Sequence, residues 1–147
     1  MLKVDFSIDP PTRDYLSQIL KSVQWDGSEK GIDLLLKHRP HPSLIPLWAI
    51  LIKEGRVVGF ATLYLPPPPS LHFAPVFIAN FVIEDALHHA GMGSFLLEKI
   101  ELWCSQMKVK ILALQTVESS ITFFISKRFC KNEQHPDILF KSLEKGA

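Results

Sequence analysis

The first part of the chain alternates polar and apolar positions and then changes to helical spacing. Residues 4–8 alternate apolar and polar side chains, which predicts a short strand. Residues 15–23 place their apolar side chains on one helical face, and Thr12 precedes them as a candidate N-cap. A second helix is predicted for about residues 28–37. Residues 39–43 are predicted to form a loop, because the prolines in and after this stretch forbid a continuous helix.

Two long apolar runs occupy the middle of the chain. Residues 47–52 and 57–65 are apolar on both faces, and the polar, glycine-containing segment between them predicts a hairpin. The prolines of residues 66–69 cannot pair in a sheet and predict a stiff connection to a third strand, residues 75–83. Because strands that are apolar on both faces must be covered on both faces, we expect helices on either side of the sheet.

The second half of the chain alternates helices and strands. The spacing of apolar side chains predicts helices for about residues 91–107 and 119–131, and strands for residues 110–117 and 137–143. Neither an internal repeat nor a domain linker is visible. The order of elements predicts an α/β fold, with one mixed sheet covered by helices on both faces, in a single domain spanning residues 1–147.

The amino-acid composition argues against several classes of protein. The 147 residues are 47% hydrophobic and 21% charged, which is ordinary for a globular protein and argues against disorder. The 16 basic and 15 acidic side chains give a formal net charge of +1, without the positive excess of nucleic-acid-binding domains. No signal peptide is visible, and the longest apolar run, residues 74–83, is about half of what a membrane span needs. We therefore expect a cytoplasmic protein with no nucleic-acid partner and no membrane partner.

Cysteine and histidine usage does not predict a disulfide scaffold or a metal site. Cys104 and Cys130 are too few for such a scaffold and lack the spacing of a metal knuckle, so both are expected to be reduced thiols on helix faces. His38 and His41 form a His-x-x-His pair, but they lie in a proline-broken loop with no third ligand nearby. The sequence therefore predicts no metal.

The most informative segment runs from residue 78 to residue 94. A predicted strand ends, a short loop follows, and Gly91 and Gly93 open the next helix. The first amides of a helix lack internal partners, and together with the helix dipole they form an anion site suited to a pyrophosphate. A Gly-x-Gly pair is weak by itself, since both glycines could serve only the turn. A Rossmann site fits less well, because Leu96 stands where a third glycine is required.

Two motifs in this half of the chain resemble a known family. Residues 88–93 read His-His-Ala-Gly-Met-Gly, which resembles the Arg/Gln-x-x-Gly-x-Gly/Ala hallmark of the GNAT superfamily of N-acetyltransferases. Residues 120–129 look like the Ala-x-x-Phe-Tyr-x-x-x-Gly-Phe helix of the same family. The element order also matches along nearly the whole chain. The resemblance implies a GNAT-like fold, with a central, mostly antiparallel twisted sheet, and acetyl-coenzyme A as the cosubstrate.

The resemblance also implies which residues bind the cofactor. Backbone amides of residues 88–94 would cradle the pyrophosphate, while backbone groups of Phe81 and Ile83 would pair with the pantetheine arm like an extra strand. One of these amides would polarise the thioester carbonyl. Phe124 would line the thiol end. The implied cofactor-binding residues are Phe81, Ile83, His88, His89, Ala90, Gly91, Met92, Gly93, Ser94 and Phe124.

The sequence departs from the family pattern at several positions, among them Val117 and Glu118, which stand where members often have an asparagine. His88 stands at the Arg/Gln position of the first motif. Phe124 stands where many members have a tyrosine that protonates the leaving thiolate, and phenylalanine has no proton to donate. Arg128 replaces the family glycine before Phe129, so the turn at that point is expected to be reshaped.

Three residues are candidates for a catalytic role. Asn80 lies at a strand position where relatives often have an acid, and its amide could hold a water molecule or the substrate but cannot act as a base. Glu84 and Glu118 lie just past predicted strand ends, where α/β sheets place functional groups. Both could equally be solvated loop carboxylates.

The resemblance implies an N-acetyltransferase. It would move an acetyl group from acetyl-coenzyme A to a primary amine of a small molecule or a protein, by direct attack in a ternary complex. The alternative is a non-catalytic GNAT-like module that binds coenzyme A or a protein partner. A third possibility is an unrelated α/β domain whose glycines merely start a helix. A homodimer is possible on the family pattern, and nothing in the sequence decides it.

Overall fold

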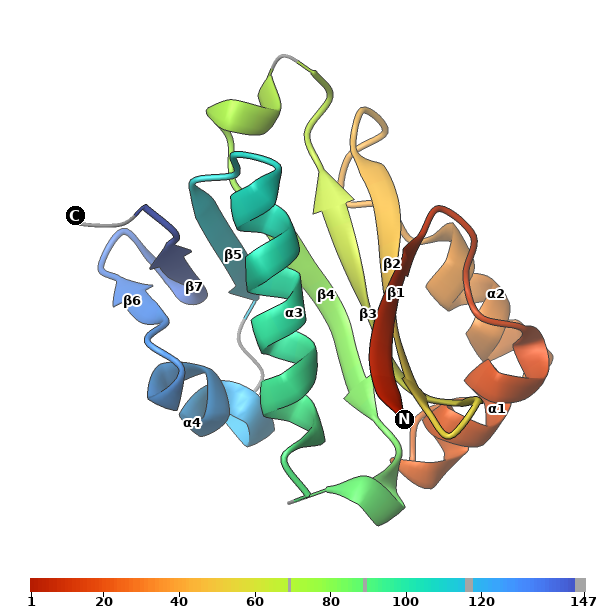
Figure 1. Cartoon of the computed structure of the whole chain (residues 1–147). Coiled ribbons are helices and arrows are strands. Elements are labelled where there is room, and N and C mark those ends of the chain that lie inside the picture. Colours follow the sequence, from red (N-terminus) through yellow and green to blue (C-terminus); the bar gives the residue numbers. More distant parts are fainter. Residues whose placement is uncertain (69, 89, 116–117, 145–147) are drawn as a thin grey trace.

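The computed structural model contains one seven-stranded sheet (Figure 1). It describes residues 1–68, 70–88, 90–115 and 118–144, with the backbone alone at positions 118 and 119. In chain order the strands are β1 (Leu2–Ser7), β2 (Ile45–Lys53), β3 (Arg56–Leu65), β4 (Val76–Ile83), β5 (Ile111–Gln115), β6 (Cys130–Asn132) and β7 (His135–Ser142). Their order across the sheet is β1-β2-β3-β4-β5-β7-β6, and only β4 and β5 are parallel neighbours. The predicted mixed, mostly antiparallel sheet is confirmed.

Helices cover both faces of this sheet, as expected from strands that are apolar on both sides. The helices are α1 (Arg13–Ser22), α2 (Glu29–Lys37), α3 (Met92–Gln106) and α4 (Glu118–Ser126), with single 3₁₀ turns η1 (Ser70–His72) and η2 (Asp85–Leu87). Helix α3 lies across one face in Figure 1, and α1 and α2 lie on the other. Within the described residues, no helix is both long enough and apolar enough to cross a membrane.

Two separate apolar cores hold the layers together. On the α3 face, Leu96, Ile100 and Cys104 repeat every four residues and are fully buried against alternate side chains of the strands. On the opposite face, Leu16 and Ile19 of α1 pack with side chains of the central strands, among them Trp48, Ile50, Phe60 and Val82. Burial of each of these large side chains contributes on the order of 2 kcal/mol to stability.

The predicted hairpin of the central strands is confirmed, but the predicted fourth helix is too long. Strands β2 and β3 form an antiparallel pair that begins with Lys53 opposite Arg56, next to the turn. Helix α4 ends at Ser126, whereas the apolar spacing predicted a helix to about residue 131. The chain turns at Arg128, and β6 then pairs with β7 at the sheet edge. Cys130 consequently lies on a strand, not on a helix face as expected.

Three helices end in the same hydrogen-bonded turn without glycine. Gln24 after α1, Lys108 after α3 and Arg128 after α4 have φ values of 62°, 65° and 74°. The amide of the next residue donates to the carbonyl five positions back, in the pairs Trp25–Leu20, Val109–Cys104 and Phe129–Phe124. This pattern is the Schellman motif, in which glycine is the usual left-handed residue. Arg128 thus forms a Schellman turn although it is not glycine, at the position where the sequence led us to expect a reshaped turn.

Candidate functional site

Strands β4 and β5 separate halfway along β4. Their pairing covers Val76, Phe77 and Ile78 opposite Leu112, Ala113 and Leu114. Strand β4 continues to Ile83, and among the described residues no strand pairs with residues 80–83 on the β5 side. Apart from the carbonyl of Ile83, which contacts the ring of His88, the main-chain groups on this side of β4 are therefore open to an extended ligand that can act as an additional strand.

A β-bulge at Asn80 lies where the two strands separate. Thr62 pairs with Ala79 and Phe60 with Val82, so β4 carries one residue more than β3 across this stretch. Asn80 adopts φ +51°, a left-handed conformation that asparagine tolerates better than most residues. Its Nδ2 lies 3.4 Å from Oγ1 of the buried Thr62.

The bulge also reverses which side chains of β4 face each core. Before it, Val76 and Ile78 pack on the α3 face, and after it Ile83 does so while Val82 turns to the α1 face. If side chains had alternated strictly between the two faces of the sheet, Val82 would face the same side as Ile78. The extra residue therefore reverses which side chains at the end of β4 face each core.

Helix α3 begins beside the open half of β4. Its N-cap is Gly91, whose φ of +79° is a left-handed conformation that favours glycine. The amides of His88 and Ala90 donate to the carbonyls of Asp85 and Leu87 within the preceding turn. The first amides of the helix, in residues 92–94, have no intrahelical acceptor, and Gly91 offers no side-chain cap to them. These donors and the helix dipole favour an anion.

A pocket of about 480 Å³ lies on the other side of Asn80, between α1, α2 and β4. Its lining is mostly apolar, with one carboxylate, and consists of Leu20, Trp25, Asp26, Gly31, Leu34, Leu35, His38 and Asn80. Asp26 Oδ1 accepts hydrogen bonds from the hydroxyl (2.5 Å) and the amide (3.0 Å) of Ser28, and these bonds hold the pKa of Asp26 below its usual range. The pocket therefore presents a fixed anion beside apolar walls.

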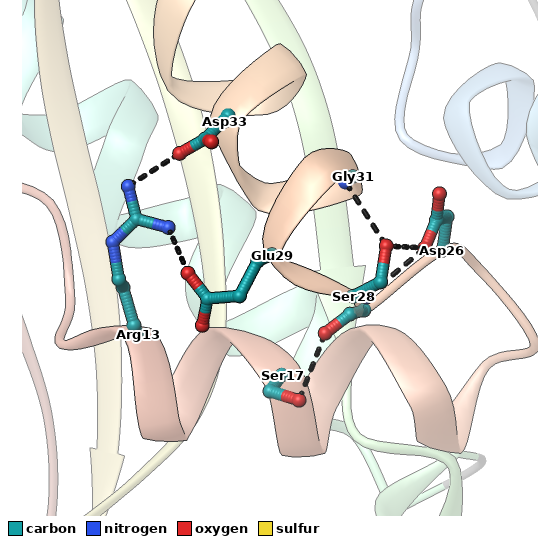
Figure 2. Close-up of polar contacts among 8 residues, drawn as sticks. Arg13, Ser17, Asp26, Ser28, Glu29, Gly31 and Asp33 are labelled. Atoms are coloured by element: carbon teal, nitrogen blue, oxygen red, sulfur yellow. Dashed lines mark hydrogen bonds and ion pairs between the residues drawn. The ribbon is translucent and has the colours of Figure 1, made fainter.

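The α1–α2 hairpin that builds the pocket is fixed by polar contacts (Figure 2). The Arg13 guanidinium bridges Glu29 and Asp33 on α2, at 2.9 and 2.5 Å. Ser17 Oγ donates to the carbonyl of Gly27 at 2.9 Å, and the Gly31 amide donates to Ser28 Oγ at the start of α2. On the far side, the buried hydroxyl of Tyr64 donates to the carbonyl of His38, and burial raises the Tyr64 pKa.

Comparison with known proteins decides the family. The sequence matches the model of the acetyltransferase (GNAT) family over residues 12–124. The chain belongs to the GNAT family. Acyl transfer is the activity of that family, and the predicted resemblance is confirmed. No curated protein matches the chain by sequence.

Solved structures show the same GNAT fold at low sequence identity. A GNAT-family acetyltransferase from Staphylococcus aureus is similar at a TM-score of 0.71 and 12% identity, covering 98% of this chain and 100% of the other. The ribosomal-protein-S18-alanine N-acetyltransferase from Escherichia coli is similar at 0.68 and 14% identity, covering 100% and 97%. GCN5 from Tetrahymena is similar at 0.68 and 13% identity, covering 99% and 98%.

In this GNAT chain, the side chain of His88 positions the turn before α3. Its Nε2 lies 2.8 Å from the carbonyl oxygen of Ile83, and its Nδ1 lies 3.6 Å from the carboxylate of Asp85. The ring thus ties the turn to the end of β4. His89, which was also predicted to contribute an amide, lies outside the described residues.

An aromatic cluster occupies the GNAT motif of α4. The ring of Phe124 is 4% exposed and lies 5.4 Å from Phe81 and from Phe129, measured between ring centroids. A Cβ on Gly93 would lie 3.3 Å from Phe123, so the first turn of α3 packs tightly against α4. The structure thus brings together Phe81, Gly93 and Phe124, which were predicted for the pantetheine arm, the pyrophosphate and the thiol end of the cofactor, respectively. Their roles stay predictions.

Of the two candidate carboxylates, only Glu84 has a described side chain, and it pairs with a basic residue. The half-buried Glu84 forms an ion pair with Arg56 of β3 at 2.8 Å. The side chain of Glu118 lies outside the described residues, and its backbone begins α4. Within the described part of the chain, no three His, Cys, Asp or Glu side chains are grouped to hold a metal ion. The carboxylate in the pocket beside Asn80 is Asp26, which sequence analysis did not single out.

Proposed function

We propose that this GNAT protein is an N-acetyltransferase that moves an acetyl group from acetyl-coenzyme A to a primary amine of a small molecule or a protein. One observation carries the proposal. Asn80 stands at the separation of β4 from β5 and also lines the pocket beneath α1 and α2. A donor lying along β4 and an acceptor in the pocket would meet at this residue.

The open half of β4 and the start of α3 fit acetyl-coenzyme A. The amides of residues 92–94 would bind its pyrophosphate. The main chain of Phe81 and the amide of Ile83 would hydrogen-bond to the pantetheine arm, whose two amide groups can mimic a strand. The chemistry that acetyl-coenzyme A supplies is an activated acetyl thioester.

Direct attack of the amine requires few groups from the protein. The neutral amine forms a C–N bond with the acetyl carbon, the C–S bond breaks, and the sulfur leaves with the bonding electrons. A main-chain amide of β4 would donate to the developing oxyanion. Asn80 can orient the amine or a water molecule, while the proton of the amine passes to water because an amide is no base. With Phe124 in place of tyrosine, the thiolate leaves unprotonated, which a thiol with a pKa of about 8.5 permits.

Two observations favour a second candidate function, a non-catalytic module that binds coenzyme A. Phe124 is buried among other aromatic rings and has no hydroxyl, and the carboxylate of Glu84 is paired with Arg56. Such a module would bind coenzyme A saturably and release no thiol with any amine.

Calorimetric titration with acetyl-coenzyme A tests the cofactor, with coenzyme A and ATP as the comparison ligands. We expect saturable binding of both coenzyme A species and weaker binding of ATP. A thiol-release screen over a panel of amines then separates the transferase from the module. Failure to bind either coenzyme A species would overturn both candidate functions.

A further inference from the structure

The carboxylate of Asp26 is held in one position at the wall of the pocket beside Asn80. Oδ1 of Asp26 accepts both hydrogen bonds from Ser28 (Figure 2). The backbone of Gly31 packs so closely that a Cβ there would lie 2.5 Å from Asp26 Cγ. The same loop places the aromatic ring of Trp25 in the pocket lining. The arrangement is therefore built before any ligand arrives.

Unlike its acidic neighbours, Asp26 lacks a paired cation. Glu29 and Asp33 on α2 both form ion pairs with Arg13. In the part of the chain that the structure describes, no lysine or arginine forms an ion pair with Asp26, and Lys30 acts on it only at longer range. Hydrogen bonds from Ser28 are the main cause of its lowered pKa, so the group is an anion at neutral pH. A positively charged group of a ligand could therefore form an ion pair with the Asp26 carboxylate.

The remaining walls of the pocket suit a hydrocarbon chain. Leu20, Leu34 and Leu35 supply aliphatic surface. Leu34 is 63% exposed and Trp25 is 47% exposed, so large apolar groups line the solvent-facing rim. Trp25 can also attract an ammonium group through its ring face. Apolar walls with few polar groups are typical of small-molecule sites, in which the polar groups set orientation.

We propose that the acceptor is an aliphatic diamine, with one ammonium group bound at Asp26 and Trp25 and the other end, as a neutral amine, at Asn80. This inference rests on the proposed function. The free amine forms the C–N bond with the acetyl carbon, the C–S bond breaks, and the amine proton goes to water. The products are the monoacetylated diamine and coenzyme A, and the ammonium group at Asp26 stays unchanged.

The test compares diaminopentane with aminopentane, which differ only in the second amine. With acetyl-coenzyme A, the wild-type protein is expected to show a KM about 2- to 5-fold lower for diaminopentane, the range of an ion pair with an exposed carboxylate such as Asp26. Asp26→Asn keeps an oxygen for the two Ser28 bonds and loses the charge. It should raise the KM for diaminopentane by about the same factor and the KM for aminopentane by less, because aminopentane has no second ammonium group.

The control is Glu29→Gln, which removes a charge from the same hairpin but not from the pocket. It should leave both substrates unaffected. Equal KM values for the two amines in the wild type, or an equal effect of Asp26→Asn on both, would overturn the diamine inference and leave the N-acetyltransferase proposal standing.

A binding measurement separates failure of the inference from failure of the proposed function. Diaminopentane and aminopentane are titrated without acetyl-coenzyme A, and the indole NMR signal of Trp25 is followed. Selective binding of diaminopentane that Asp26→Asn abolishes would support the subsite even if no amine is acetylated. Absence of selective binding, together with no preference in turnover, would overturn it.

Discussion

Asn80 and Gly91 show how single backbone conformations shape the site. Asn80 is left-handed within β4 and creates the bulge beside the pocket. Gly91 is left-handed at the start of α3, and among the described residues nothing lies within 4 Å of the position a Cβ would take. Glycine is therefore favoured there by the backbone conformation and not by crowding from the described residues.

Gly91→Glu should abolish binding of acetyl-coenzyme A, because it places a negative charge where the pyrophosphate is expected. Gly55→Glu is a matched control. Gly55 has φ +75°, open space around it and a place in the β2–β3 turn, away from α3. Both variants should lose about 1 kcal/mol of stability from the left-handed backbone. Calorimetry should detect binding only in the control, and normal binding by Gly91→Glu would show that the site assignment is wrong.

Phe124→Tyr should increase kcat and leave the affinity for acetyl-coenzyme A nearly unchanged. The new hydroxyl would supply the proton that the leaving thiolate lacks in the wild type. A steady-state thiol-release assay measures the change. Phe129→Tyr, in the same aromatic cluster, is the control. An equal effect of both substitutions would argue that Phe124 does not lie at the thiol end.

At the scale of elements, turns rather than helix propensity decide where helices stop. Helices α1, α3 and α4 all end in Schellman turns at non-glycine residues. A non-glycine residue in this conformation costs on the order of 1 kcal/mol, which the two hydrogen bonds and the packing of the following residue offset. For α4, the following residue is Phe129, which is 2% exposed.

Arg128→Gly is expected to stabilise the protein by about 0.5–1 kcal/mol. Glycine relieves the strain of the left-handed conformation in the folded state, and this gain exceeds the cost of the greater conformational entropy of glycine in the unfolded state. Lys127→Gly is the control, since Lys127 is not among the left-handed residues. That variant should be neutral or destabilised. Urea unfolding measures both. A lower midpoint for Arg128→Gly would mean that the arginine side chain contributes more than the turn costs.

The α1–α2 hairpin should weaken in acid. Arg13 lowers the pKa of Asp33 below the usual 3.8, so the ionised form is favoured in the folded state. This contribution is present above pH 3.8 and is lost as the pH falls through the lower, folded value. Wild type should therefore lose more stability than Asp33→Asn between about pH 5 and pH 3 in thermal melts. Equal acid sensitivity of the two proteins would show that the ion pair contributes nothing.

At the scale of the whole molecule, a sheet covered on both faces divides the chain into protected and accessible positions. Cys104 lies in the core beneath α3 and is fully buried, while Cys130 on β6 is exposed at the sheet edge. Burial, with a smaller effect from Glu101, raises the pKa of Cys104 to about 12. Its thiolate is therefore scarce at neutral pH.

A thiol reagent should modify one cysteine rapidly in the folded protein and two in denaturant. Mass spectrometry should place the fast modification on Cys130, and Cys130→Ser should remove it. Reaction at Cys104 requires the core beneath α3 to open, so its rate reports that opening. Fast labelling of Cys104 in the native protein would contradict the packing of α3 on the sheet.

The sequence by itself determined the features that depend on neighbouring residues. Periodicity predicted the β2–β3 hairpin and α3, since local spacing decides which face of a strand or helix is buried. The glycines at 91 and 93 marked the start of α3 and its open amides, because turn chemistry is also local. The resemblance of two motifs to a known family added the prediction of a GNAT-like fold.

Only the tertiary structure decided the features that depend on distant segments. The bulge at Asn80 arises from the register of β4 against β3. Strand β6 forms by pairing with β7. The place of Asp26 in the pocket follows from the packing of α1 and α2 over β4. The pairing of β3 with β4 and the packing of α1 and α2 are set by contacts between residues far apart in the chain, and the local spacing of apolar side chains did not reveal them.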